Sequence, residues 1–406
     1  VEGAPMGLMH KRGYTYLKTI AGTVLAMAII VTLQSVKPVF AGSDLSDVIR
    51  QDADIMRSVD QEEDSSNNRR CINFSDFQAG FSLDMLAGTQ ILWRTERWED
   101  RAWDGKGPDT LGYPSVVRNI YGDGADYKYY LYYSHHGPSA GIGCAVSDCI
   151  EGPYRKLAEI DSTRLDSQVL RCGGKYGDAA HFSSPCVVWN EDVKAWYMYF
   201  HFLKNEWKEG KGHQKTALAS CSNLRENSWK PFTDDSGNLK VVLPTTSERW
   251  MNSQSSYHAI QRLHNGLWSA FLRGTGGSFF DDRWVQDPCK LGFAFSKNAE
   301  SWEYATTNPV IYQGDGRGGK SGVYRPKFVA YLGGVKYLVC WQESDSYDVN
   351  PVIVCGRTSD FKAFEKIRDG YSQLPVGDGM MCLWRIGTKL FVFSGRYVYV
   401  MRIFGR

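Results

Sequence analysis

The sequence predicts an all-β protein, a five-bladed β-propeller with four-stranded antiparallel blades. This prediction rests on two repeated sequence elements. The first element is a strand of small residues that ends in Ser or Thr and is followed, after a short turn, by an aromatic residue. It occurs at residues 141–148, 216–223, 291–297 and 352–360, before Tyr154, Trp229, Trp302 and Phe364. Strand-rich units that recur every ~60 to 75 residues are typical of propeller blades rather than of solenoid turns.

The second repeated element is a strand pair that precedes each copy of the first. Its strands alternate aromatic and β-branched residues between Gly, Asn and Asp turns, which is the pattern of half-buried antiparallel hairpins. The pairs are 113–117 with 129–133, 184–189 with 196–200, 257–261 with 267–271, 324–329 with 337–341, and 379–384 with 389–393. Each pair predicts one blade, and residues 71–103 are expected to lead into the propeller and close one blade.

The N-terminal part divides into two segments before the propeller domain, which we place at 76–406. Residues 1–41 resemble a signal peptide with some upstream residues, because Lys11 and Arg12 precede an apolar run that ends in small residues near Ala41. The run is too short and too interrupted by Thr and Gly to predict a membrane span, so an uncleaved anchor is the less favoured alternative. No stable membrane span is expected after the signal is cleaved. Residues 42–75 are rich in Asp, Glu, Ser and Asn and predict a flexible linker. The mature protein is therefore expected to be secreted or periplasmic.

The charge and the cysteine content indicate which partners, crosslinks and metal sites to expect. The formal net charge is +2, with 47 basic and 45 acidic residues, so nucleic acid is not an expected partner. In an exported chain the ten cysteines are disulfide candidates. Three pairs are close in sequence, namely Cys144 with Cys149, Cys172 with Cys186, and Cys340 with Cys355. Neither a Cys-x-x-Cys pair nor a His-Cys cluster occurs, so no metal site is predicted.

Taken together, the repeats resemble those of the five-bladed β-propeller glycoside hydrolases: arabinanases and xylosidases, invertase-type furanosidases and neoagarobiose hydrolases. The resemblance rests on residues 113–117 with 129–133, on 141–154, and on 183–189 with 196–201. It implies that the innermost strands begin at the rim of a central funnel, where side chains converge on a sugar. Glycoside hydrolysis then needs two carboxyl-type groups on either side of the glycosidic bond.

The resemblance directs the search for catalytic groups to the starts of these strands. The position before Pro114, where the family commonly has an acid, is Tyr113, so the nearby Asp109 is the candidate base or nucleophile. Asp178 precedes the second strand. The third strand offers His258 as the candidate acid, because a histidine titrates near neutrality and neoagarobiose hydrolases use one as proton donor. Asp378 precedes the fifth strand. Asp109 and Asp378 are also compatible with ordinary turns.

Other polar and aromatic residues at the same strand starts are candidates for substrate binding. They are Tyr113, His181, Ser183, Tyr257, Tyr324 and Arg325. An arginine fork suits a sugar rich in hydroxyl or carboxylate groups. We expect His201 to lie farther out and Glu343 to belong to a solvated loop. Residues 314–321 match the letters of a phosphate-binding loop, but a strand start follows instead of a helix, so nucleotide binding is not expected.

Two functions remain open at this stage. The first is an exported glycoside hydrolase that acts on a polysaccharide or oligosaccharide, with no required cofactor, although the resemblance makes a Ca²⁺ ion plausible. The second is a non-catalytic glycan-binding or exopolysaccharide-assembly protein on the same propeller. The absence of the usual acids at the first and third strand starts favours the second.

Overall fold

The computed structural model describes residues 88–100, 111–135, 137, 140–173, 179–204, 214–280, 283–311, 322–333, 336–344, 352–366, 381–386 and 389–402. Within these residues the chain consists mostly of antiparallel strands, with one short α-helix, α2 (Leu157–Ile160), and one 3-10 helix, η3 (Arg97–Asp100). Both lie outside the strand ladders.

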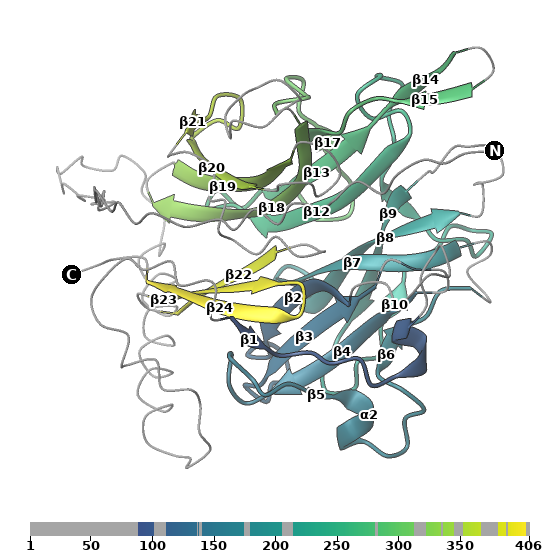
Figure 1. Ribbon diagram of the computed structural model, residues 1–406, viewed down its shortest axis with the longest axis vertical. Helices are drawn as coiled ribbons and strands as arrows, with labels where there is room; N and C mark the ends of the chain where they lie inside the picture. Colours follow the sequence, from purple (N-terminus) through teal and green to yellow (C-terminus); the bar gives the residue numbers. More distant parts are fainter. Residues whose placement is uncertain are drawn as a thin grey trace, which may run out of the picture.

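The sheets follow one another along the chain (Figure 1). The first contains β2 (Gly112–Arg118), β3 (Tyr129–Ser134), β4 (Ile142–Ser147), β5 (Arg155–Lys156) and β6 (Gln168–Leu170). The second contains β7 (Ala179–Asn190), β8 (Ala195–Lys204), β9 (Gln214–Cys221), β10 (Lys230–Pro231) and β11 (Val241–Leu243). The third contains β12 (Gln254–Arg262), β13 (Trp268–Thr275), β16 (Lys290–Ser296) and β17 (Glu303–Tyr304).

Two further sheets complete the C-terminal part. One contains β18 (Gly322–Gly333), β19 (Lys336–Ser344), β20 (Val352–Thr358) and β21 (Glu365–Lys366). The other contains β22 (Met381–Ile386), β23 (Lys389–Ser394), β24 (Tyr397–Arg402) and β1 (Thr89–Gln90). A two-stranded ribbon of β14 (Gly277–Phe280) and β15 (Arg283–Gln286) projects from the third sheet (Figure 1).

The first strands of the sheets contact one another in a closed circuit. β2 contacts β7, β7 contacts β12, β12 contacts β18, β18 contacts β22, and β22 contacts β2. Each sheet then extends outward from this circuit, so that β5, β10, β17 and β21 lie at the periphery (Figure 1). The predicted all-β propeller arrangement is confirmed, and each predicted hairpin forms.

The N-terminal strand closes the last sheet. β1 pairs with β24, with Thr89 opposite Val398 and Gln90 opposite Tyr397. The expectation that residues before 103 close a blade is therefore confirmed for 89–90, while 71–87 lie outside the described residues. The chain continues from β1 as a segment that we call the strap, residues 91–100. It begins in the core shared by the first and last sheets and passes beside β5.

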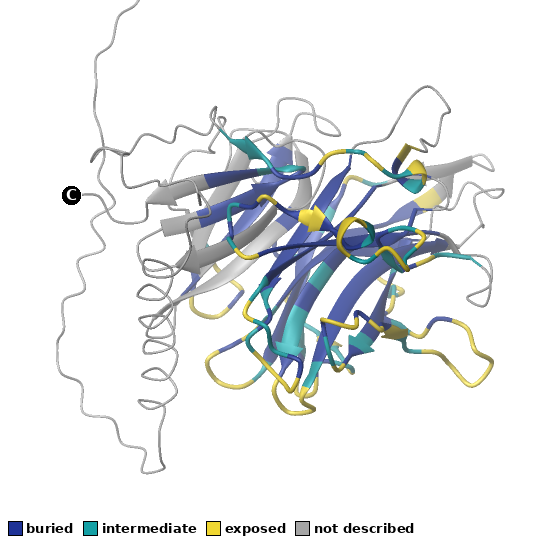
Figure 2. Ribbon diagram, turned by 90° about the horizontal axis from the view of Figure 1, so that it is seen from below, coloured by how far each residue is buried: buried dark blue, intermediate teal, exposed yellow. Residues whose placement is uncertain are grey.

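Apolar cores lie between neighbouring sheets because alternate residues of each strand face opposite sides. Between the first two sheets, Tyr132 and Cys144 pack with Phe200 and Met198. Between the second and third, Tyr199 and Tyr197 pack with Leu272 and other residues of β13. The strands are accordingly buried on both faces, and exposed residues are concentrated in the connecting turns (Figure 2).

Two of the expected disulfides do not form. Cys144 is a buried thiol in the core between the first two sheets, so the pairing with Cys149 is wrong. Cys172 and Cys186 are also thiols, and they pack against different cores on opposite faces of the second sheet, which separates them. Cys340 and Cys355 lie directly opposite each other on β19 and β20.

Among the described residues, no helix is long and apolar enough to cross a membrane. The segment 1–41, on which the predicted signal peptide rests, and the linker 42–75 lie outside the described residues.

Candidate functional site

Three first strands share an unusual backbone conformation near their starts. Tyr113, Ser184 and Tyr257 have φ values of 55°, 55° and 47°, in the left-handed region that residues with a side chain seldom adopt. At each position the strand register shifts, between Gly112 and Ser115 on β2 and at matching places on β7 and β12. Such bulges re-aim side chains, and strained backbone of this kind is concentrated at functional sites.

The re-aimed tyrosines meet where the first three sheets adjoin. The rings of Tyr113 and Tyr257 have their centroids 6.1 Å apart, and both residues are buried. The His201 ring lies 4.8 Å from the Tyr257 ring, and the His181 ring lies 5.3 Å from the His201 ring. Side chains from β2, β7, β8 and β12 are thus brought together at one end of the circuit of first strands.

Arg273 on β13 borders this cluster. Its guanidinium carbon lies 4.1 Å from the centroid of the Tyr257 ring, a cation–π geometry. Its Nη2 donates to Gln214 Oε1 at 2.9 Å, to Gln254 Oε1 at 2.8 Å and to Ser256 Oγ at 3.2 Å. Three neutral acceptors therefore fix a buried positive charge against the tyrosine face.

The serines beside the cluster form their own hydrogen bonds. Ser134 and Ser183 hydroxyl oxygens lie 3.0 Å apart, and the Ser184 backbone N–H donates to Ser134 Oγ at 3.2 Å. Ser183 is the direct cross-strand neighbour of His201. These contacts connect the first sheet to the bulge of the second and hold its strained backbone in place.

Two of the predicted histidines have strongly lowered pKa values. Burial, with a smaller contribution from the positive charge that His135 would carry, lowers the pKa of His181 to about 3. Burial lowers the pKa of His258 to about 4, and a hydrogen bond with the Tyr199 backbone opposes this only in part. Both rings are therefore neutral at pH 7.

His258 follows Tyr257 on β12 and packs against the second sheet. Its Nδ1 lies 3.4 Å from Thr216 Oγ1, and its ring centroid lies 5.9 Å from that of Tyr199. Because Thr216 and Tyr199 belong to the second sheet, His258 packs in the interface between the second and third sheets.

The remaining predicted residues fall partly outside the described part of the chain. Asp109, Asp178 and Asp378 lie outside it altogether. Tyr324 and Arg325 lie on β18, where the register shifts between Val323 and Arg325 as it does at the other bulges, but their side chains are not described. The structure thus brings together Tyr113, His181, Ser183 and Tyr257 of the predicted set.

A register common to the second strands identifies residues that the sequence reasoning missed. In four sheets the residue just before the bulge is paired with a buried polar residue on the second strand. These partners are Ser134, His201, Arg273 and Glu343, opposite Gly112, Ser183, Ser256 and Val323. Alignment of the hairpins at their bulges, instead of at their apolar strands, would have revealed them.

Two expectations are corrected by this register. His201 does not lie farther out, since it contacts both Tyr257 and His181. Glu343 does not belong to a solvated loop, since it lies on β19, is 1% exposed, and accepts a hydrogen bond of 2.9 Å from the Trp341 indole N–H. Glu343 is one of the two buried carboxylates in the described part of the chain, the other being Glu99.

The cluster offers aromatic faces and hydrogen-bonding groups, which suits an uncharged or acidic polyol ring. In the part of the chain that the structure describes, no group of three or more His, Cys, Asp or Glu side chains could hold a metal ion.

Comparisons with known proteins show which solved structures share this fold. No family model matches the sequence, and no curated protein matches it. Among solved structures, one glycoside hydrolase has 10% identity and a TM-score of 0.54, with 87% of this chain and 96% of that chain covered.

Two further solved structures resemble this chain to a similar degree. A protein from Parabacteroides distasonis, classed provisionally as a glycoside hydrolase, has 11% identity and a TM-score of 0.51, with 79% and 95% of the two chains covered. A provisionally classed glycosidase from Bacteroides thetaiotaomicron has 13% identity and a TM-score of 0.51, with 80% and 96% covered. At these identities the likeness establishes a shared fold.

Proposed function

We propose that this chain, which has the β-propeller fold of glycoside hydrolases, is itself an exported glycoside hydrolase that cuts a polysaccharide or oligosaccharide. The observation that carries the proposal is the convergence of Tyr113, Tyr257, His201 and Arg273 at strained bulges of adjacent first strands. Each of the five sheets with four or more strands is one blade in this proposal, and the sugar binds where their first strands begin.

The proposed chemistry divides between acids and binding groups. Asp109, Asp178 and Asp378 supply the carboxylates that activate water or attack the anomeric carbon. Glu343 joins them as a candidate because it is buried beside the start of β18. Tyr113, Tyr257, Tyr324, His181, Ser183 and Arg325 bind the sugar through ring faces and hydrogen bonds. Arg273 acts through Tyr257 as a positioning residue.

His258 is the proposed proton donor, and its environment sets a condition on that role. Since burial lowers its pKa to about 4, the ring carries a proton only in acid. A reaction that depends on this donor should accelerate as the pH falls toward 4. A rate that does not change over this range would assign proton donation to a carboxyl group instead.

Export and cofactor use complete the proposal. Residues 1–41 direct the chain to a secreted or periplasmic location, where the facing Cys340 and Cys355 would oxidise to a disulfide. No cofactor is required, and a Ca²⁺ ion in the funnel would serve only to orient the substrate.

The test is release of reducing ends from plant, algal and bacterial polysaccharides by the wild type and by single variants. Asp109→Asn, Asp178→Asn, Asp378→Asn, Glu343→Gln and His258→Gln are compared with Asp192→Asn, which changes an exposed partner of Arg262. Loss of a general acid or base should lower kcat by about 10²–10⁴-fold. If none of the five falls below Asp192→Asn, the assignment of these groups is wrong.

A non-catalytic glycan-binding protein is the second candidate. It is favoured by Tyr113, Ser184 and Tyr257, which occupy the bulges of three first strands without a carboxylate. If the wild type is retained by a polysaccharide yet releases no reducing ends from any of them, this second function is the correct one.

A further inference from the structure

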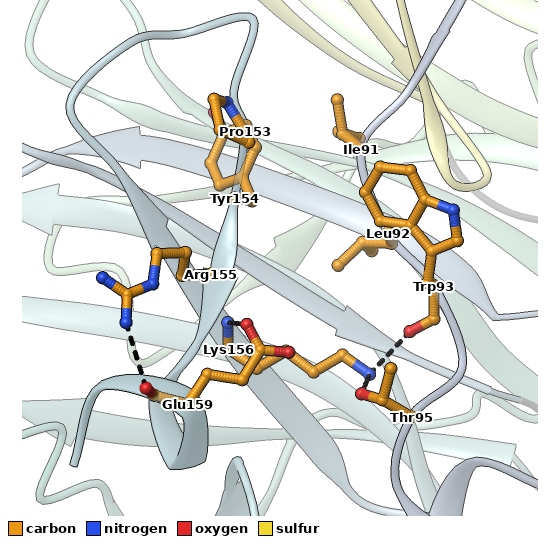
Figure 3. A pocket seen from close by; sticks show the side chains of 9 residues that line it. All are labelled: Ile91, Leu92, Trp93, Thr95, Pro153, Tyr154, Arg155, Lys156 and Glu159. Atoms are coloured by element: carbon orange, nitrogen blue, oxygen red, sulfur yellow. Dashed lines mark hydrogen bonds between the residues drawn. The ribbon is translucent and has the colours of Figure 1, made fainter. Parts of the chain in front are cut away.

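A cavity lies at the β5 edge of the first sheet, remote from the strand starts. It has a volume of about 330 Å³ and lies between the strap and the segment that contains β5 (Figure 3). The strap contributes Ile91, Leu92, Trp93 and Thr95, and the other side contributes Pro153, Tyr154, Arg155, Lys156 and Glu159. β5 is the outermost strand in the order β2-β3-β4-β5, so this cavity is separated from the tyrosine cluster by the width of the sheet.

Trp93 is the distinctive residue of this cavity. Its side chain is 51% exposed, although the adjoining Ile91 and Leu92 are buried. Figure 3 shows its ring on the opposite side of the cavity from Pro153 and Tyr154. A large aromatic ring that stays exposed at the edge of a cavity forms a flat face on which the C–H side of a sugar ring can pack.

Lys156 holds the backbone of the strap in place at Trp93. Lys156 Nζ donates to Trp93 O at 2.7 Å and to Thr95 Oγ1 at 2.9 Å, and it forms a buried ion pair of 2.6 Å with Glu99. The strap is thereby held to β5 at Trp93 and at the residues that follow it. A face held in place before binding costs less entropy when a ligand arrives.

The edge of the cavity carries polar groups suited to hydroxyls. Arg155 and Glu159 are both exposed at its rim, and Arg155 Nη2 donates to the Glu159 backbone oxygen at 3.1 Å. One cation and one carboxylate together carry no net charge, so the rim matches a neutral ligand with donors and acceptors. The volume lies at the lower end of the range for small-molecule sites.

We propose that this cavity is an accessory binding site for a neutral pyranose unit of a polysaccharide, with Trp93 as the stacking face and Arg155 and Glu159 as hydrogen-bonding groups. The proposal rests on the proposed function for its ligand class. The site would hold a long chain beside the propeller while another part of the same chain occupies the strand starts.

The test is native affinity electrophoresis of the full protein through gels that contain xylan, galactan, mannan or agarose, which consist of neutral pyranose units. At least one polysaccharide should retard the wild type, and Trp93→Ala should weaken this retardation about tenfold, whereas Trp93→Phe should restore most of it. Tyr127→Ala is the matched control, because Tyr127 is 61% exposed but does not line the cavity.

The results separate this proposal from the hydrolase proposal. Retardation that depends on Trp93 supports the site even if no reducing ends are released. If Trp93→Ala is retarded as strongly as the wild type, or if no polysaccharide retards the wild type, the proposed accessory site is wrong. The hydrolase proposal would not be affected, because it could still be tested by hydrolysis of short oligosaccharides.

Discussion

Arg273 lies over the face of Tyr257, with the guanidinium carbon 4.1 Å from the ring centroid, and this contact connects the second strand of the third sheet to the bulge of its first strand. The three neutral acceptors around Nη2 hold the guanidinium in place, and its flat face packs on the tyrosine ring.

Arg273→Lys should therefore lower kcat/KM on the order of 100-fold, because lysine keeps the charge but lacks the planar guanidinium that packs on Tyr257 and positions it. Arg262→Lys is the matched control, since Arg262 also lies over an aromatic ring, that of Trp268, but at an exposed edge. Steady-state kinetics with near-UV circular dichroism test this. Equal losses in the two variants would show that Arg273 has no positioning role.

The buried pair of Lys156 and Glu99 predicts a large effect on stability. Lys156→Met leaves the Glu99 carboxylate buried without its cation, which should cost about 3–5 kcal/mol in the free energy of unfolding. The double variant Lys156→Met, Glu99→Gln should recover part of this loss.

Urea unfolding measures these values, and the exposed pair of Lys194 with Glu191 provides the control. Lys194→Met should change the free energy of unfolding by less than about 1 kcal/mol. A Lys156 variant as mild as this control would mean that the strap is not held by its ion pair.

Stability should fall as the pH is lowered from 6.5 toward 4. The folded pKa values of His181 and His258, about 3 and about 4, lie below the ordinary value of 6.5. The unfolded chain therefore binds protons in this window while the folded chain does not, so stability present above 6.5 is progressively lost. One pKa unit corresponds to about 1.4 kcal/mol, so the combined effect should reach several kcal/mol.

Urea unfolding at a series of pH values tests this. The variant His181→Gln, His258→Gln should show a clearly smaller slope between pH 6.5 and 4.5. Carboxylates such as Glu191, whose pKa is lowered from 4.5 by a hydrogen bond from Lys194, lose their contribution to stability at lower pH. They therefore do not obscure the effect of the histidines between pH 6.5 and 4.5. The same slope in wild type and variant would contradict the prediction.

The facing positions of Cys340 and Cys355 predict a cross-strand disulfide. Directly opposed residues of antiparallel strands have Cα atoms about 4.5–5.5 Å apart, within the range that a disulfide spans. Non-reducing peptide mapping should recover the two as one crosslinked fragment.

Native alkylation gives the internal control for this mapping. Cys144 should stay unlabelled, because burial raises the pKa of its thiol well above the usual range. Labelling of Cys340 and Cys355 as thiols in protein purified under oxidising conditions would refute the crosslink.

The sequence predicted the sheets well because hairpins are local, and the alternation of aromatic and β-branched residues places each strand without knowledge of its neighbours. The disulfides were harder, because closeness in sequence does not reveal which face a side chain takes: Cys172 and Cys186 point to different cores. The same limit applies to the site. Glu343 and His201 belong to second strands, and only the register of each hairpin shows that they reach the level of the bulges.

The pairing of β1 with β24 determines when the ring of sheets can close as the protein is synthesised. The edge that Thr89 and Gln90 complete does not exist until Tyr397 and Val398 have left the ribosome, so the ring cannot close before β24 emerges. Closure of so long a loop costs chain entropy that must be offset by the final sheet as a whole. A ribosome stalled before β24 would therefore carry an open, protease-sensitive chain.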